Sequence, residues 1–434
     1  MDDASKISDD YASLMPLSIR QTFGAMELTV SRLGSDSFNT SNMLMFMKEI
    51  SSDGNVNTAD IIFPAWPLLL YISPGVGKQL LLPLLEYQAT GQYPNSWAAH
   101  DIGTKYPNAT GHNDGTQISS TRANILTSAE SGNMLIMTLS YTQRTNDNSL
   151  IKNYYGLLDK WGRYLVENAL TPTLQLSSDD PAGPLANQTN LAIKGIIGIK
   201  AMSEIANIMG DSQRSANYST IALAYVQDWE NFAMSSDSTH LMLAYGNSSS
   251  WGITYNLYAD KLLETKWYSS HANVFGFPLD TRVDYAKSDW QMFTAATTTD
   301  DSVRDTFISL VQKYAADGKN AKPFSDLYGS LDGISQDPEA RPVVGAHLAL
   351  LALQSNSSIF SISPSESMSD GGATSTGTTS VSGASGQPPV TVTSTATTPS
   401  TTGTASSALS RWDRTYGLSK AVVWACSAIG ALTY

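Results

Sequence analysis

Long apolar stretches separated by polar loops cover most of this sequence. Between residues 63 and 90 the chain is rich in leucine, and Pro67, Pro74 and Pro83 interrupt it. Two buried helices fit this stretch better than strands, because the apolar runs are long and contain few β-branched residues. A helix followed by a short extended run is predicted at 10–31, and further helices at 134–147, 149–169, 190–210, 212–234, 291–297, 300–316 and 343–354.

The predicted helices follow one another with polar loops between them, and strand signals are few. At 149–169 the apolar residues, among them Leu150, Leu158 and Trp161, share one face, as in a helix that packs against a core. About ten to twelve helices in this order fit an all-α (α/α)6 toroid, in which paired helices surround a central funnel. An open α-solenoid fits the helix count nearly as well. The apolar runs at 63–90 are shorter than the ~18–20 residues of a membrane-spanning helix.

One polar stretch, from Asn95 to Asn133, is longer than an ordinary connection, and long polar loops inside compact domains are usually functional or disordered. Its aromatic residues Trp97 and Tyr106 favour order, so we expect it to form the rim or floor of an active site. Its candidate functional residues are two histidines with neighbouring carboxylates and a glutamate just before an apolar helix: His100, Asp101, His112, Asp114 and Glu130.

A shorter polar loop precedes the first long apolar stretch. Asp53, Asn55 and Asn57 have the spacing that begins a calcium-binding EF-hand loop, and Asp60 follows them. The glycine and the glutamate that such a loop needs further along are missing, so a hydrogen-bonded turn is the stronger prediction.

The composition of the chain changes near its C-terminal end. From 361 to 409 it consists of Ser, Thr, Gly, Ala and Pro with almost no charge, so residues 356–409 are predicted to form a disordered stalk. Residues 410–434 end in an apolar segment that fits either a GPI-attachment signal or a plain disordered tail. The folded domain is therefore expected within residues 1–355.

The net charge of -13 and the pI of about 4.7 disfavour binding to nucleic acid or to an anionic membrane surface. Contact with a membrane or cell wall is expected only through a C-terminal anchor. Cys426 is the one cysteine of the sequence and lies in the tail. The body therefore has no disulfide framework, no Cys-based zinc site and no Cys nucleophile.

Six N-x-S/T sequons fit a secreted glycoprotein, although an Asn- and Ser-rich chain contains a few by chance. They begin at Asn39, Asn108, Asn187, Asn217, Asn247 and Asn356. The opening MDDASKISDD has neither the charged nor the apolar region of a signal peptide. The sequence thus predicts either that the protein is intracellular or that this sequence lacks the protein's true N-terminus.

Several blocks of the sequence, from about Tyr11 to Leu353, resemble the fungal glutaminase A family of secreted amidases, which convert L-glutamine to L-glutamate and ammonia. The blocks include KEISSDGNVNT, FPAWPL, HDIGTKYPNATGHNDG, ESGNMLIM, SSDDPAGPLANQTNLAIKGIIGIKAM, PLDTR, KSDW and ARPVVG. The resemblance implies a helical toroid, L-glutamine as substrate, no cofactor and a secreted or cell-surface location. It also implies a preceding β-rich domain, which this sequence lacks wholly or mostly.

Amide hydrolysis needs an activated water or a nucleophile, a proton donor and groups that hold the oxyanion. Without a Cys in the body, a water activated by a carboxylate is the simplest scheme, and a Ser nucleophile with a Lys or Asp helper is the second. Glu130 is our first candidate for the general base, although a glutamate there also favours a helix dipole. The other candidates are Asp101, Asp114, Asp179 and Asp180, each of which could instead cap a turn or a helix.

An amino-acid substrate carries a carboxylate and an ammonium group, so the site needs a cation and an anion to bind them. Arg282 with Asp280 or Asp289 is one candidate set, and Lys287 lies beside them in PLDTRVDYAKSDW. A structural salt bridge explains these residues equally well. The histidines of the long polar loop, His100 and His112, are further substrate-binding candidates, whereas His240, His271 and His347 belong to no motif.

The sequence departs from the family pattern at two places. Ala129 stands where the family has a second glutamate next to Glu130, and residues appear inserted before it. Between YADKLL and PLDTR the chain is shorter than the family's connection. Two other classes of protein therefore stay open: a glycoside hydrolase, since helical toroids often host paired-carboxylate sugar chemistry, and a cell-surface protein with an eroded catalytic site.

Overall fold

The computed structural model describes residues 2–35, 37–49, 54–115, 127–176, 183–262 and 275–354. Several residues and segments singled out above lie outside the described residues: Asp53, Asp179, Asp180, His271, Cys426, the stalk and the tail.

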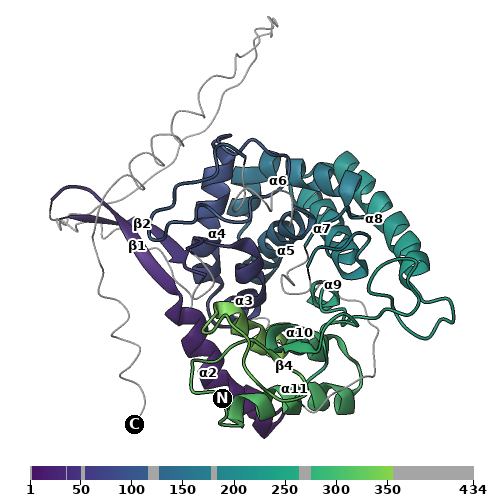
Figure 1. Ribbon diagram of the computed structural model, residues 1–434. Helices are drawn as coiled ribbons and strands as arrows, with labels where there is room; N and C mark the ends of the chain where they lie inside the picture. The colour runs from purple at the N-terminus through teal and green to yellow at the C-terminus, as the bar shows by residue number, and fades with distance from the viewer. Residues whose placement is uncertain are drawn as a thin grey trace, which may run out of the picture.

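Six helical segments form a closed inner ring (Figure 1). In chain order they are α3 (Ala59–Ile72), α5 (Thr127–Thr145), α7 (Thr189–Ile208), α9 (Leu257–Leu262), α10 (Ser288–Thr297), and the 3-10 helix η2 (Pro342–Leu348) continued by α12 (Ala349–Gln354). Each packs against the next, and η2 and α12 pack back against α3. This closure confirms the predicted toroid and rules out an open solenoid, in which the first and last helices would not meet.

The outer helices alternate with the inner ones along the chain, except that α9 and α10 follow one another in the described part of the sequence. They are α2 (Asp9–Gly24), α4 (Pro74–Ala89), α6 (Ser149–Asn168), α8 (Ser212–Ala233) and α11 (Asp301–Ala316), and the short α1 (Asp2–Ser5) precedes them. The labels of these outer helices surround those of the inner ring in Figure 1.

The burial of each helix follows from its place in the toroid. The inner helices α3, α5 and α7 are buried over most of their length, which suits the largely apolar sequences of α3 and α7, whereas α5 also buries many small polar residues. The outer helix α6 buries only one face, through residues such as Leu150, Leu158 and Trp161, as the sequence predicts. None of the helices in the described ranges combines the length and the apolar character needed to cross a membrane.

Two antiparallel strand pairs accompany the helices. The first is the hairpin of β1 (Met26–Arg32) and β2 (Phe38–Met47), which projects from the helical body in Figure 1. The sequence predicts only a short extended run in this part of the chain, so this hairpin is longer than expected. The second pair, β3 (Tyr285–Lys287) and β4 (Leu327–Gly329), places Lys287 opposite Leu327 and so brings two distant charged loops together.

Candidate functional site

The N-terminal ends of α3 and α5 are joined by the first part of the long polar loop. The backbone N–H of Ala59, at the start of α3, donates to the carbonyl of His100 at 2.7 Å. The backbone N–H of Ala98 donates to the hydroxyl of Ser131, in α5, at 3.1 Å. The loop is thus held against both helices, and side chains from all three segments can meet.

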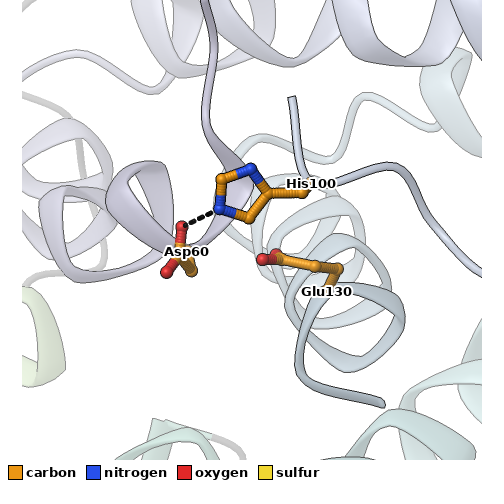
Figure 2. Close-up of side chains that lie close together, drawn as sticks. All are labelled: Asp60, His100 and Glu130. Carbon is orange, nitrogen blue, oxygen red and sulfur yellow. Dashed lines mark ion pairs between the residues drawn. The ribbon is translucent and has the colours of Figure 1, made fainter. Parts of the chain in front are cut away.

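Asp60, His100 and Glu130 converge at this junction (Figure 2). Asp60 lies in the first turn of α3, Glu130 in the first turn of α5, and His100 in the loop between them. His100 Nε2 lies 3.4 Å from Asp60 Oδ1, and one donor atom from each of the three residues falls within 4.8 Å of the others. The side chain of Asp60 is 13% exposed, that of His100 is 6% exposed, and Glu130 is fully buried.

Asp101 orients the imidazole of His100 by binding its Nδ1, the ring nitrogen that does not face Asp60. Its Oδ2 lies 2.8 Å from His100 Nδ1, and its Oδ1 lies 2.6 Å from His112 Nε2 and accepts the backbone N–H of Gly103 at 2.6 Å. Burial alone would raise the pKa of Asp101, but the two histidines lower it well below its usual value. An ionised Asp101 therefore keeps the proton of His100 on Nδ1 and directs Nε2 toward Asp60 and Glu130.

Glu130 occupies an unusual electrostatic position for a carboxyl group. Burial, and then the charge of Asp60, raise its pKa well above its usual value, while His100 and Lys194 act in the opposite direction. Its Oε2 accepts a hydrogen bond from the Asn133 amide at 3.4 Å. Its Oε1 is buried without a hydrogen-bond partner among the described residues. Strong perturbation of a buried carboxyl beside a histidine is typical of functional sites.

The inner helix α7 packs against α5, the helix that carries Glu130. A Cβ at Gly132 would lie 3.0 Å from the Lys194 backbone, so the glycine allows α5 and α7 to approach closely. Lys194 Nζ donates to Asn133 Oδ1 at 2.9 Å and lies 3.1 Å from the centroid of the Phe63 ring. Burial lowers the pKa of Lys194 well below its usual value.

A second cluster of buried charges forms around the β3–β4 pair. Lys287 Nζ lies 3.4 Å from Asp289 Oδ2 and 3.5 Å from Asp326 Oδ2. Arg341 donates to both oxygens of Asp326, at 3.0 and 2.5 Å. Burial raises the pKa of Asp289 to about 6, whereas Arg341 and Lys287 overcome burial and lower the pKa of Asp326. Two cations and two carboxylates thus share one site.

Asp280 and Arg282 bind each other. Arg282 Nη2 donates to Asp280 Oδ2 at 2.7 Å, and Arg282 Nε donates to Oδ1 at 3.0 Å. The pair borders a small hollow that is also lined by Thr189, Asn190 and Tyr255. This is the salt bridge that the sequence left open as an alternative to substrate binding.

The structure brings together four of the loop residues predicted from the sequence: His100, Asp101, His112 and Glu130. Asp114 lies in an exposed turn two residues after His112. Sequence reasoning missed Asp60 as a member of the site. The available signal was a lone carboxylate inside the otherwise apolar run ADIIFPAWPL.

In the described part of the loop before α3, Asn57 forms a hydrogen-bonded turn of the kind predicted, whereas Asp53 lies outside the described residues. Asn57 adopts a left-handed conformation with φ 52°. Its side-chain oxygen accepts the backbone N–H of Met47 at 2.7 Å, and its amide donates to the carbonyls of Met45 and Leu80. The Asn57 side chain is therefore engaged with the protein backbone, and its turn leads the chain into the first turn of α3.

Comparisons with known proteins show the family to which the chain belongs and two of its relatives. Residues 8–351 match the model of the glutaminase A six helical-hairpin domain. The chain is 41% identical over 371 residues to Glutaminase A of Aspergillus oryzae (strain ATCC 42149 / RIB 40), covering 81% of this chain and 51% of that protein. It is 33% identical over 445 residues to a probable glutaminase of Arthroderma benhamiae, covering 80% and 50%. The chain thus spans about half the length of these relatives.

The fold also resembles a solved structure of a metal-independent alpha mannosidase from Streptococcus pneumoniae in complex with alpha-1,6-mannobiose. The TM-score is 0.57 at 11% sequence identity, and the match covers 81% of this chain and 97% of the mannosidase. At this identity the match supports the toroidal fold alone.

Proposed function

This chain belongs to the glutaminase A six helical-hairpin family, and we propose that it hydrolyses the side-chain amide of L-glutamine to L-glutamate and ammonia. The observation that carries the proposal is the convergence of Glu130, Asp60 and His100 at the N-terminal ends of two inner helices. A relative named Glutaminase A, 41% identical, supplies the reaction class.

The proposed reaction is attack of a water molecule on the amide carbon, assisted by the carboxylate of Glu130. Water adds its oxygen to the carbon, the C–N bond breaks, and the proton that the water loses is returned to the leaving nitrogen. Asp60 and His100 complete the polar group that holds this water. The N-terminal ends of α3 and α5 favour negative charge as it develops on the oxygen of the amide.

Asp101 and His112 act through His100 in this scheme. They fix the tautomer and the orientation of its ring, and neither faces Glu130 directly. The polar groups proposed to bind the substrate's ammonium and carboxylate are Asp289 with Lys287, and Arg282 with Asp280. Each is now paired within the protein, so a substrate would have to share or replace those partners.

The discriminating experiment measures ammonia release from L-glutamine by the purified protein, beside L-asparagine and a panel of aryl glycosides. We expect ammonia from L-glutamine and no sugar release. Sugar release without ammonia would instead assign the paired carboxylates to glycoside hydrolysis. A folded protein inactive on every substrate would indicate an eroded site.

A secreted or cell-surface location is part of the same proposal, because the relatives are fungal glutaminases and the resemblance is to secreted amidases. Separation of expressing fungal cells into medium, wall and cytosol tests the location. Recovery of the full-length protein in the cytosol alone would contradict it.

A further inference from the structure

The cluster around Glu130 contains three carboxyl groups and two histidines, and the buried Lys194 lies beside it. Asp60, Asp101 and Glu130 surround His100, and His112 contacts Asp101 through Oδ1, the oxygen that does not bind His100. The fully buried Oε1 of Glu130 has no hydrogen-bond partner in the described part of the chain. A buried oxygen of this kind requires a partner, because an unpaired polar atom in the interior is costly.

We propose that Asp60, His100 and Glu130 bind a divalent cation through Asp60 Oδ1, His100 Nε2 and Glu130 Oε1. The donor set of one imidazole nitrogen and two carboxylate oxygens suits ions such as Zn²⁺, Co²⁺ or Mn²⁺. Three protein ligands leave one position of a tetrahedral ion open for water, which is the arrangement of catalytic zinc sites.

The distances in the cluster fit such an ion. Ligand atoms at ~2.0–2.2 Å from a tetrahedral ion lie about 3.4 Å from each other. The separation of His100 Nε2 and Asp60 Oδ1 is 3.4 Å, and all three donor atoms lie within 4.8 Å of one another. The carboxyl group of Glu130 lies on the same side of the cluster as Asp60 and His100 (Figure 2).

The surroundings of His100 supply a second, independent feature of metal sites. A ligating histidine usually donates its other ring N–H to a carboxylate, which fixes the ring and strengthens the ligand. Asp101 accepts in this way from His100 Nδ1 at 2.8 Å. Asp101 is itself held by His112 and by the backbone of Gly103, so His100 presents Nε2 in a fixed direction.

The consequence for catalysis rests on the proposed glutaminase function, whereas the binding of the ion does not. A divalent ion makes its bound water a stronger nucleophile near neutral pH. Glu130 would then assist the attack by holding the ion rather than by removing the proton alone. The family resemblance implied no cofactor, so this inference departs from that expectation.

The test uses the untagged protein after treatment with a chelator. It is incubated with Zn²⁺, Co²⁺ or Mn²⁺ and passed through a desalting column, and the retained ion is quantified by mass spectrometry. We expect the wild type to retain about one ion per chain. Asp60→Asn, His100→Gln and Glu130→Gln should each lose that ion, while Asp101→Asn should bind ~10–100-fold more weakly.

His240→Gln is the matched control, because His240 lies in the loop after α8 and its ring contacts Thr239. It should retain the ion like the wild type. Circular dichroism verifies that each variant is folded, and the visible spectrum of the Co²⁺ form reports directly on nitrogen and oxygen ligation. Equal retention by the wild type and by folded His100→Gln, or no retention by the folded wild type, would overturn the site.

Parallel ammonia assays separate this inference from the proposed function. Retention of the ion with no ammonia release supports the cation site and contradicts the glutaminase function. Full ammonia release by protein shown to be free of ions supports the glutaminase function and overturns the cation's part in it.

Discussion

The two buried charge clusters of this toroid contain similar residues but differ in their balance of charge. In the cluster around the β3–β4 pair, which we call the balanced cluster, Lys287 and Arg341 face Asp289 and Asp326, so cations and carboxylates are equal in number. In the cluster around Glu130, the carboxylates of Asp60, Asp101 and Glu130 outnumber the positive charge that His100 and His112 can supply, and burial favours the neutral form of the neighbouring Lys194.

The difference is visible in two buried histidines. Burial lowers the pKa of His347 to about 3, and the opposing charge of Asp326 is too weak to offset it. Burial also acts to lower the pKa of His100, but the carboxylates around it prevail and raise its pKa well above the usual value. In the balanced cluster, the charges of Lys287 and Arg341 therefore offset those of Asp289 and Asp326. The acidic cluster needs a proton or a cation, and such a need is what makes a site chemically useful.

The largest expected effect is on catalysis at the acidic cluster. Glu130→Gln preserves the size of the side chain and its contact with Asn133 but removes the carboxylate. We expect ammonia release to fall ~10²–10⁴-fold, the usual consequence of losing a general base. The melting temperature should change little, because the isosteric amide leaves no cavity.

Glu204→Gln on α7 is the matched control for this substitution, since the side chain of Glu204 is 43% exposed and pairs with Lys200. It should retain full activity. A fully active Glu130→Gln would exclude Glu130 from the mechanism and move the proposal to Asp60. An unfolded Glu130→Gln would make Glu130 a structural residue.

The next effect is on stability at the balanced cluster. Arg341→Met leaves the buried carboxylates of Asp326 and Asp289 with Lys287 as their remaining cation. Removing one partner of a buried ion pair costs ~3–5 kcal/mol, so urea denaturation should show a loss of that order. Arg304→Met, which removes a more exposed guanidinium paired with Asp301 and Asp305, should cost under ~1 kcal/mol.

The double variant Arg341→Met/Asp326→Asn sharpens the test. If charge imbalance causes the loss, neutralising Asp326 should recover most of the stability of the single variant. No recovery would mean that Arg341 contributes through packing, and the two clusters would then differ less than we propose.

The sequence predicted the helices of the toroid well because their apolar patterns are long. The prediction of 149–169 corresponds to α6 at Ser149–Asn168, and that of 190–210 to α7 at Thr189–Ile208. The sequence analysis missed most of the β1–β2 hairpin. This hairpin begins soon after α2 ends at Gly24, and it pairs Met26 with Met47, which lies 21 residues later in the chain. Such pairing depends on contacts between distant residues, which a local pattern does not show.

The candidate site was predicted in part for the same reason. His100, Asp101, His112 and Glu130 lie within one polar loop and its boundary, so composition alone identified them. Asp60 was missed because it reaches the site from another helix, through the bond between the Ala59 N–H and the His100 carbonyl. Likewise Asp326 and Arg341 meet Lys287 only because β3 pairs with β4.

A smaller effect should appear in the pH dependence of stability through His347. This histidine is buried, its Nδ1 lies 2.8 Å from the hydroxyl of Ser18, and its folded-state pKa of about 3 is below the unfolded value. As pH falls below ~6.5, the unfolded chain binds a proton that the folded protein does not, so stability decreases. Between pH 7.5 and pH 5 this contributes about 2 kcal/mol of lost stability.

His347→Gln should remove that contribution. The variant is expected to be less stable than the wild type at pH 7.5, and the difference should shrink by about 2 kcal/mol at pH 5. Urea denaturation at the two pH values measures it. An unchanged difference would show that His347 is protonated in the fold, and the contrast with His100 would fail.

The smallest effect concerns a charged pair on the outside of the same inner helix that carries Lys194. Lys200 and Glu204 lie one turn apart on α7, at 2.8 Å, with side chains 46% and 43% exposed. Water already solvates both charges, so Lys200→Met should change stability by no more than ~0.5 kcal/mol and leave ammonia release unchanged. Thermal denaturation and the ammonia assay measure both quantities. A loss of stability as large as that of Arg341→Met would show that stability depends on the number of charges and not on their burial and balance. The comparison between the two clusters would then lose its physical basis.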